Sequence, residues 1–322
     1  MSRTTVGVLR GGTSREYDLS LKTGAAMMAA LPEDQYDVRD IFIDRAGMWH
    51  RRGMPTDPAR ALQQIDVVLN ALHGGVGEDG SVHRILDRAG VAYAGSGALA
   101  SALSYHKPRA REVLAAAGIR VPLGMSFSLG SEIPTDRMAR QVFERFGPPY
   151  VVKPASEGHG HGIMIASSII DLPFIIADAL EEFGVVVVEE YVVGREATTL
   201  IIEDFRDEAL YATPPARLYL PEGARYLDPA SRSLMRHTVP GDFSHGERED
   251  ILAIARAAHR ALGMSHFSRA DIMLNRRGVP YLLEVNATPK FHEGALTPHL
   301  LESVGSSVRE FLEHAIHLAR RA

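Results

Sequence analysis

The sequence predicts an α/β protein of several domains, in which a parallel α/β unit is followed by α+β units. Three observations predict this class. The first hundred residues alternate between short β-rich runs and helical stretches, which is typical of a parallel sheet covered by helices. From about Gly95 the pattern changes to that of a small α+β unit with antiparallel strands. The length of 322 residues exceeds one hydrophobic core and suggests two or three domains.

The first domain is expected to bind a ligand at one edge of its sheet. Two expected strands end in glycine pairs, Gly11-Gly12 and Gly74-Gly75. Ligands of parallel α/β sheets bind at the carboxyl ends of the strands, so these turns predict a binding edge. The segment GGTSRE lacks the G-x-G-x-x-G spacing of a dinucleotide site, which disfavours an oxidoreductase. The elements expected here are strands over 5–12, 36–44 and 65–75 and helices over 19–31 and 78–90.

The rest of the chain combines short strands with one long stretch that lacks periodicity. A strand, a glycine-rich loop and a second strand are expected over 148–167, and a strong strand over 185–194. Residues 213–240 are rich in proline and arginine and predict a long loop, which is often functional when it interrupts a compact domain. Further strands are expected over 195–204, 269–275 and 280–289, and helices over 106–119, 174–184, 248–263 and 307–322.

Composition excludes several classes of protein. Lys plus Arg number 35 against 40 for Asp plus Glu, so the net charge of −5 offers no positive excess for nucleic acid or anionic lipid. The absence of cysteine excludes disulfides, thiolate catalysis and Cys-ligated zinc. No apolar run approaches the roughly 18 residues of a membrane span, and MSRTTVGVLRGG lacks the apolar core of a secretory signal. We therefore expect a soluble cytoplasmic protein.

The last two expected strands carry the most informative polar residues. Glu284 and Asn286 are two apart on one strand, so their side chains share a face. If the RRG turn pairs Leu274 with Val279, Asp271 lies diagonal to Glu284, at about 7–8 Å between Cβ atoms. Such oxygen ligands suit Mg²⁺ that is held partly by substrate phosphates. The alternative is that the carboxylates form ion pairs with a neighbouring arginine or face solvent, and the apolar residues around them favour the metal.

A second group of residues suggests phosphate binding. Lys153 ends an apolar strand, and Gly158, Gly160 and Gly162 allow backbone N–H groups to surround phosphate oxygens. A surface hairpin is an equal alternative for this segment alone. Lys107 opens a helix, where a cation is unfavourable unless an anion lies between it and the helix.

Two carboxylates belong to the segment VVVVEEYVVGRE, which includes the strong strand. Glu189 lies where its apolar run ends, and Glu196 follows seven residues later. They either accept hydrogen bonds from a ribose or an adenine amino group, or they are ordinary helix or loop charge.

Together these segments resemble the D-alanine–D-alanine ligase family of ATP-grasp enzymes. The resemblance covers nearly the whole chain and implies the ATP-grasp architecture. It implies an N-terminal Rossmann-like substrate domain over 1–96 and two ATP-grasp subdomains, over 97–188 and 189–322, that clamp ATP between them. The matching segments, in the family's order and spacing, are GVLRGGTSREYDLSLKTG, NALHGGVGEDGSVHRILDRAGVAYAGSGALASALSYHK, YVVKPASEG, VVVVEEYVVGRE, RADIMLN and YLLEVNATP.

The resemblance also implies a reaction. ATP converts the carboxylate of one D-alanine into an acylphosphate, and the amine of a second D-alanine attacks it, giving D-alanyl-D-alanine for peptidoglycan precursor synthesis. Two Mg²⁺ ions, or Mn²⁺ in their place, neutralise phosphate charge during the transfer. The partners implied are these small molecules. The family is typically homodimeric, although no feature of the sequence establishes a dimer.

Site residues are implied position by position. The ATP contacts are Lys107, Lys153, Gly158, His159, Gly160, Glu189, Glu190, Tyr191, Val192 and Glu196. The metal ligands are Asp271, Glu284 and Asn286. Arg269 matches the arginine that stabilises the transferred phosphoryl group and the tetrahedral intermediate. The residues around the amino acids are Glu16, which receives the first ammonium, His73 beside that pocket, and Arg225 and Tyr226 on the mobile loop over the site.

The sequence departs from the family pattern at three sites. His159-Gly160 replaces the two serines of E-G-S-S-x-G, which removes the serine that links the loop tyrosine to the glutamate of the first substrate. Lys290 stands where the family has a glycine of the oxyanion hole, and Ala295 where a serine binds the carboxylate of the second substrate. Either Lys290 replaces that serine as a carboxylate anchor, or the acceptor pocket is remodelled.

Three hypotheses follow from these matches and departures. A D-alanine–D-alanine ligase comes first. A related ligase with a different amino-acid or amine acceptor, or with an intramolecular amide-forming step, comes second. A nucleotide-binding module without ligation comes last, because the arginine and all three metal positions would then have little reason to remain together.

Overall fold

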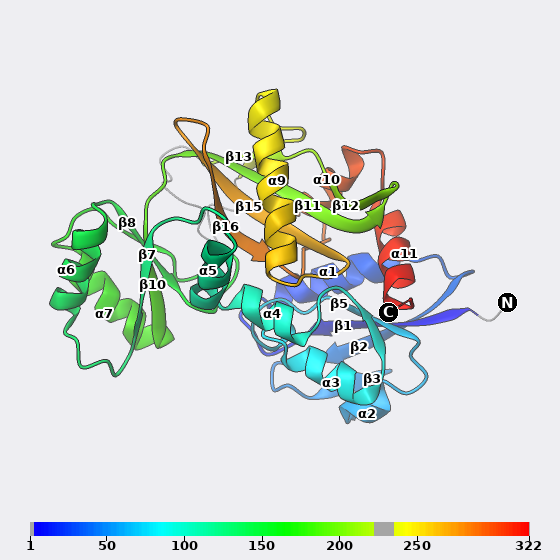
Figure 1. The fold of residues 1–322 in the computed structure, drawn as a ribbon. Coiled ribbons are helices and arrows are strands. Elements are labelled where there is room, and N and C mark those ends of the chain that lie inside the picture. Colours follow the sequence, from blue (N-terminus) through cyan, green and yellow to red (C-terminus); the bar gives the residue numbers. More distant parts are fainter. Residues whose placement is uncertain (1–2, 222–234, 322) are drawn as a thin grey trace.

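Three β-sheets form the framework of the computed structural model, which describes residues 3–221 and 235–321 (Figure 1). The first sheet contains β1 (Thr4–Gly11), β2 (Tyr36–Ile43), β3 (Trp49–Arg51), β4 (Met54–Thr56), β5 (Val67–Asn70) and β6 (Ala92–Ala94). Its order is β4-β3-β2-β1-β5-β6. The neighbours among β2, β1, β5 and β6 run parallel, whereas β3 and β4 add an antiparallel edge. The parallel α/β unit predicted for the N-terminal part of the chain is therefore confirmed.

Helices cover both faces of this sheet. Residues alternate between the two faces of a strand, so Val6 and Val8 of β1 belong to one buried cluster and Leu9 to another. The first cluster includes residues of α1 (Tyr17–Ala30) and the C-terminal α11 (Val308–Ala319). The second includes residues of α2 (Pro58–Ala61) and α3 (Ser81–Ala89). A short 3₁₀ helix, η1 (Gly75–Gly77), follows the second glycine turn.

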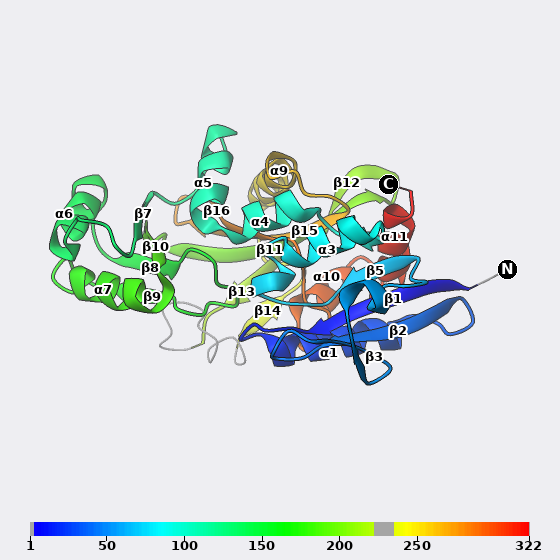
Figure 2. The same cartoon turned by 90° about the horizontal axis from the view of Figure 1, so that it is seen from below.

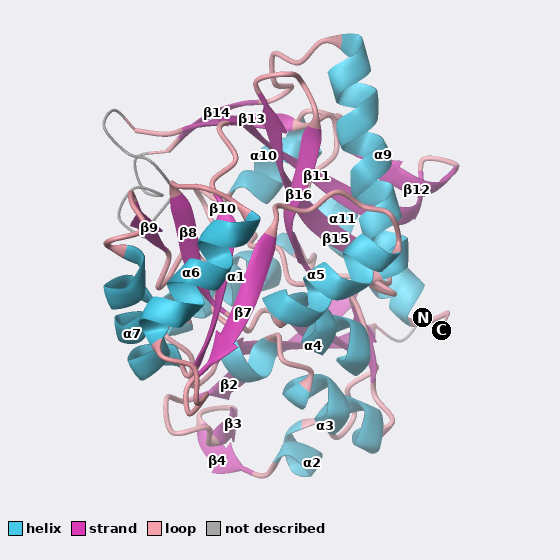
Figure 3. Ribbon diagram, turned by 60° about the vertical axis from the view of Figure 1, so that its left-hand side comes forward, coloured by secondary structure: helices cyan, strands magenta, loops and turns pink. Residues whose placement is uncertain are grey.

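The second sheet is small and antiparallel, with the order β7-β10-β8-β9. Its strands are β7 (Gly124–Ser128), β8 (Tyr150–Pro154), β9 (Met164–Ala166) and β10 (Val185–Glu190). The helices α6 (Thr135–Arg145) and α7 (Leu172–Phe183) pack on it around the fully buried Tyr150, and they lie side by side in Figure 3. The helices α4 (Ala98–Tyr105) and α5 (Lys107–Ala116) connect this unit to the first sheet.

The third sheet is antiparallel and carries the longest strands. It contains β11 (Gly194–Phe205), β12 (Glu208–Ala212), β13 (Ala216–Tyr219), β14 (Arg236–Thr238), β15 (Phe267–Asn275) and β16 (Pro280–Asn286). The order is β14-β13-β11-β15-β16, with β12 also paired to β11. The helix α9 (His245–Ala261) packs against it, contributing Ile251 and Ala255 to a buried cluster with Ile272 and Leu282.

The C-terminal helices return to the first sheet. After β16 the chain forms α10 (Leu296–Glu302) and α11, whose Phe311 and Ile316 join the cluster of Val6 and Val8. A capping box of Ser307 and Glu310 starts α11. The end of α11 consequently lies near the start of β1 (Figures 1 and 2), where Arg320 donates a 2.9 Å hydrogen bond to the hydroxyl of Thr4. This packing brings the loop between β16 and α10 to the first sheet.

The prediction of an unbroken loop over 213–240 is wrong at both ends, where β13 and β14 form. These strands have four and three residues, too few for a periodic pattern, and they form because β13 finds hydrogen-bonding partners on β11. The predicted loop residues Arg225 and Tyr226 lie outside the described residues. Within the described part of the chain, no helix combines the length and apolarity needed to cross a membrane.

Candidate active site

Two neighbouring cavities lie where the three sheets approach one another. The first has a volume of about 560 Å³. It is lined by Glu16 and Glu78 from the segments that follow β1 and β5, by Gly158 and His159 from the glycine-rich loop, and by residues of the third sheet and of the segment after β16. The second, of about 350 Å³, lies between the second and third sheets. The lining residues that the two cavities share are Lys107, Glu157, Glu196, Asp271 and Glu284.

Asp271 and Glu284 are direct partners across β15 and β16. The predicted register is wrong, because Leu274 pairs with Pro280 rather than Val279. The register then shifts between Asp271 and Ile272, which brings Glu284 directly opposite Asp271 instead of diagonal to it. A β-bulge of this kind inserts one residue into a strand, and an alternating sequence pattern does not reveal it. Directly opposite residues have Cβ atoms about 4.5–5.5 Å apart, so the two residues are closer neighbours than the predicted diagonal pair.

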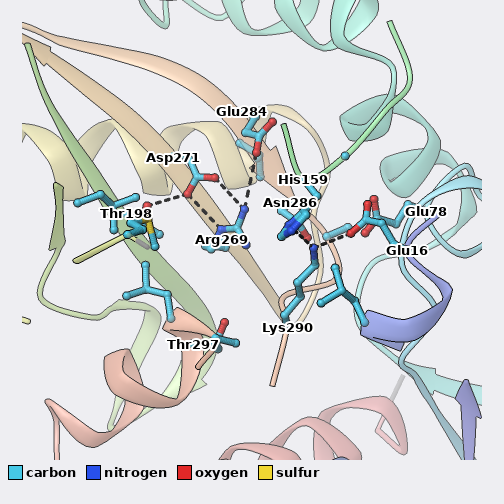
Figure 4. A pocket seen from close by; sticks show the side chains of 18 of the residues that line it. Glu16, Glu78, His159, Thr198, Arg269, Asp271, Glu284, Asn286, Lys290 and Thr297 are labelled. Atoms are coloured by element: carbon cyan, nitrogen blue, oxygen red, sulfur yellow. Dashed lines mark hydrogen bonds and ion pairs between the residues drawn. The ribbon is translucent and has the colours of Figure 1, made fainter. Parts of the chain in front are cut away.

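Arg269 lies between these carboxylates (Figure 4). It donates hydrogen bonds of 3.1 and 2.7 Å to the two carboxylate oxygens of Asp271 and lies 3.7 Å from Glu284 Oε1. The hydroxyl of Thr198 donates a further bond of 2.8 Å to Asp271 Oδ1. Burial opposes the charge of Arg269, but the neighbouring carboxylates outweigh it and raise the pKa of the guanidinium. The ion pair that the sequence left open as an alternative to metal binding is therefore present.

The same oxygens also suit a divalent cation. No cluster of three or more His, Cys, Asp or Glu side chains in the described residues is arranged to hold an ion. Asn286 supplies an amide instead, and its Oδ1 accepts a bond of 2.8 Å from the N–H of Thr288 while keeping a second lone pair. Two carboxylates and an amide are an all-oxygen donor set, which fits Mg²⁺ when substrate phosphates supply the remaining ligands.

The second cavity is bounded by a buried charge cluster around Glu189. This carboxylate is 3% exposed and pairs with Lys153 at 2.6 Å and with Arg111 at 2.7 Å. Burial alone raises the pKa of Glu189, but the two cations outweigh burial and lower it. Both oxygens of Glu189 therefore already have a cationic partner, and they hold Lys153 at the cavity wall.

The remaining predicted ATP contacts lie around the same cavity. Lys107 begins α5, donates to the carbonyl oxygen of Glu157, and has its pKa lowered by burial. The carboxylate of Glu190 accepts a 2.8 Å bond from the N–H of Leu123, which fixes the connection after β10. The other predicted contacts that line this cavity are Gly160, Tyr191, Val192 and Glu196.

In the first cavity, Lys290 joins three segments that are distant in sequence (Figure 4). Its ammonium lies 2.5 Å from Glu16 Oε2 and donates to His159 Nδ1 at 2.9 Å. Glu16 precedes α1, His159 belongs to the glycine-rich loop, and Lys290 follows β16. Two of the three departures from the family thus meet at the glutamate predicted to receive the first substrate. Ala295, the third departure, is buried at the start of α10.

His73 lies behind this wall rather than in the cavity. It is 1% exposed, and its Nε2 lies 2.9 Å from the hydroxyl of Thr23. Its Nδ1 has no hydrogen-bond partner and lies 3.8 Å from Glu78 Oε1. Burial lowers the pKa of His73 to about 3 and raises the pKa of Glu78. A neutral His73 therefore backs the acidic wall of the cavity.

The sequence interpretation missed several of these residues. Glu78 and Thr198 line the first cavity, and Arg111 reaches Glu189 from the same helix as Lys107. Arg111 is four residues after Lys107, a spacing that places both on one helix face and could have identified it. The sequence has four lysines, and three of them line the two cavities. The scarcity of lysine in the sequence was therefore a second signal that could have drawn attention to these residues.

A parallel α/β unit, followed by two α+β units that enclose lysines and a carboxylate pair, defines an ATP-grasp protein. A family model described as "D-ala D-ala ligase C-terminus" matches residues 113–317. The D-alanine–D-alanine ligase of Geobacter sulfurreducens is 33% identical over 98% of this chain and 94% of its own length. The enzyme of Desulforudis audaxviator is 32% identical over 98% of both chains. The chain belongs to the D-alanine–D-alanine ligase family.

Solved structures agree with this assignment. The VanG D-Ala:D-Ser ligase from Enterococcus faecalis superposes with a TM-score of 0.86 at 26% identity, over 99% of this chain and 100% of that one. A D-alanine–D-alanine ligase from Bacillus anthracis complexed with ATP gives 0.82 at 25% identity, over 99% and 98%.

Proposed function

We propose that the protein is an ATP-dependent ligase that joins two molecules of D-alanine through an acylphosphate. Its relatives of 32–34% identity bear the name D-alanine–D-alanine ligase. The observation that carries the proposal is the pairing of Asp271 with Glu284 beside Arg269, on the wall shared by the two cavities. A nucleotide in one cavity and an amino acid in the other would meet at this wall.

The first half of the reaction is the transfer of the γ-phosphoryl group from ATP to a donor carboxylate, which gives ADP and an acylphosphate. Lys107 and Lys153 hold the phosphates, and Arg269 takes up charge on the moving phosphoryl group. Asp271, Glu284 and Asn286 would hold Mg²⁺, which neutralises phosphate charge. Glu16 receives the donor ammonium, and the segment from Glu189 to Val192 with Glu196 holds the adenosine.

In the second half, the amine of the acceptor attacks the carbonyl carbon of the acylphosphate. A C–N bond forms, the C–O bond to phosphate breaks, and the amine loses a proton as phosphate leaves. Arg269 stabilises the negative charge of the tetrahedral intermediate. Exclusion of water protects the acylphosphate from hydrolysis. Arg225 and Tyr226 remain predictions for this step.

We propose three working units over residues 1–96, 97–188 and 189–322, and a cytoplasmic role in making peptidoglycan precursor. The decisive experiment is incubation with ATP, Mg²⁺ and D-alanine. Phosphate release with formation of the dipeptide is the expected result. If D-alanine fails to stimulate ATP turnover while ATP still binds, the proposed reaction is wrong.

A different acceptor amine is the second candidate, because the acceptor side departs from the family. Ala295 presents only a methyl group, and the ammonium of Lys290 is engaged by Glu16 and His159. Neither side chain is thus a ready anchor for a second carboxylate. A panel of D- and L-amino acids tested as acceptors decides between the candidates, since activity with D-alanine alone would eliminate this one.

A further inference from the structure

Lys290 occupies an unusual place for a lysine. Its side chain is 13% exposed, and that of its partner Glu16 is 12% exposed. Burial lowers the pKa of the Lys290 ammonium, whereas the adjacent Glu16 raises it. A buried ammonium is costly unless it is paired and hydrogen-bonded, and here Glu16 and His159 satisfy it on two sides. The contact is therefore a compensated ion pair inside the cavity wall.

The surroundings of Glu16 leave little room for a second cation. Its Oε2 is taken by Lys290. Its Oε1 lies so close to the backbone of Gly158 that a Cβ at that position would collide with it. On another side, a Cβ at Gly74 would lie 3.3 Å from the same oxygen. Oε1 is thus crowded by backbone on two sides, and an incoming ammonium that approaches Oε2 meets the position that Lys290 holds.

Another acidic residue is available to the displaced lysine. Glu78 lies beside Glu16 on the same wall of the cavity (Figure 4) and interacts electrostatically with Lys290. A lysine has a flexible four-carbon stem, so its ammonium can move between neighbouring carboxylates with little rearrangement of the backbone.

We infer that Lys290 is an internal competitor for the donor ammonium, and thereby a residue that sets donor specificity. This inference rests on the proposed function, which makes Glu16 the ammonium contact. A donor amino acid binds by exchanging its own ammonium for that of Lys290 at Glu16. The new ion pair replaces an existing one, so the ammonium adds little net affinity. A donor that carries a neutral hydroxyl in place of the ammonium therefore loses little binding affinity.

The test isolates the donor half-reaction. The enzyme is supplied with ATP, Mg²⁺, hydroxylamine and either D-alanine or D-lactate, which carries a hydroxyl in place of the ammonium. The nitrogen of hydroxylamine attacks the acylphosphate carbonyl, phosphate leaves, and the hydroxamate is measured by its colour with ferric ion. Because hydroxylamine replaces the acceptor, the acceptor pocket does not affect the readout.

Lys290→Met should lower the KM for D-alanine by about tenfold or more, because the competing cation is gone. The KM for D-lactate should not fall. Lys290→Arg keeps the charge and should keep the high KM for D-alanine. Lys22→Met, an exposed lysine on α1, is the matched control and should behave as the unaltered protein. ATP binding measured by calorimetry reports whether each variant is folded.

The outcomes separate the inference from the function on which it rests. An unchanged KM for D-alanine in a folded Lys290→Met variant overturns the competition and leaves the ligase proposal standing. If the unaltered protein binds ATP but forms no hydroxamate from either donor, the ligase proposal fails and the competition loses its basis. If Lys290→Met does not bind ATP, the KM values of the unaltered protein provide the test. Competition predicts that its KM values for D-alanine and D-lactate agree within about threefold. A KM for D-alanine about 100-fold lower than that for D-lactate overturns the competition.

Discussion

Asp271 and Glu284 face each other directly across β15 and β16, and the single guanidinium of Arg269 lies within 4 Å of both. Arg269 thus interacts with both carboxylates at the wall between the cavities, and Lys107 also interacts electrostatically with Glu284. The carboxylate oxygens make this wall a place where a divalent cation can be held together with substrate phosphates. The bulge on β16 determines this arrangement, because it brings Glu284 opposite Asp271 rather than one step along the sheet.

Glu284→Ala should therefore abolish turnover and leave the fold intact. Glu284 is half-buried, and no other carboxylate pairs with Asp271 across the strands. Steady-state phosphate release measures the loss, and thermal unfolding checks the fold. Glu249→Ala, an exposed glutamate on α9, is the matched control. Retained activity in Glu284→Ala would refute the metal assignment.

Arg111→Met should weaken ATP binding and destabilise the protein. The substitution leaves Glu189 buried with one of its two direct cationic partners, Lys153, so we expect a cost below the about 3–5 kcal/mol of a buried charge left without a partner. Lys153 is then drawn more tightly to Glu189 and is less available to phosphate. Calorimetry should show a Kd for ATP raised about tenfold. Arg109→Met, on an exposed position of the same helix, should change neither quantity, and an equal effect of both variants would contradict the role of the cluster.

His73 should make the folded protein less stable in mild acid. Its pKa falls from 6.5 to about 3 on folding, so between these values the unfolded chain binds a proton that the folded chain excludes. Stability is consequently lost as the pH falls below about 6.5, by about 2 kcal/mol at pH 5. Urea unfolding at pH 8 and pH 5 should show a loss smaller by about this amount in His73→Gln. His317→Gln, an exposed histidine on α11, should retain the full loss; equal losses in all three proteins would disprove the assignment.

Much of the fold was predictable, because its long elements are periodic. The buried run that forms β1 and the carboxylate-ending run that forms β10 both appear as strands in the sequence and in the structure. The failures are short strands such as β13 and β14, which have too few residues for a pattern and depend on partners elsewhere in the chain. The predicted register of β15 and β16 was wrong for a related reason, because the bulge depends on how the two strands pair and not on the sequence of either strand alone.

The residues of the candidate site were likewise predictable only in part. Lys153 and Glu284 were predictable from chemically informative residues at strand ends. Glu78 and Thr198 were not, because the residues around them form no spaced motif and their place in the cavity depends on elements that are distant in sequence. The contact of Lys290 with Glu16 was beyond the sequence, because it joins a loop after β16 to the start of α1 through the packing of three sheets.

Ala295→Ser and Lys290→Gly should separate the two amino-acid subsites. Ala295 is buried at the start of α10 on the wall of the first cavity, so a serine there restores a hydroxyl that can bind the acceptor carboxylate. Lys290→Gly removes the competing cation from the donor side. The first change should lower the acceptor KM in dipeptide synthesis and leave hydroxamate formation unchanged, whereas the second should act on both assays.

The two effects should add in the double variant, because one substitution acts on the acceptor and the other on the donor. The double variant should therefore make D-alanyl-D-alanine more efficiently than either single variant, as measured by kcat/KM at saturating ATP. Ala295→Ser on its own is the informative control, because it leaves Glu16 and Lys290 untouched. If Ala295→Ser changes hydroxamate formation as strongly as dipeptide formation, position 295 belongs to the donor subsite, and the acceptor carboxylate must be bound elsewhere.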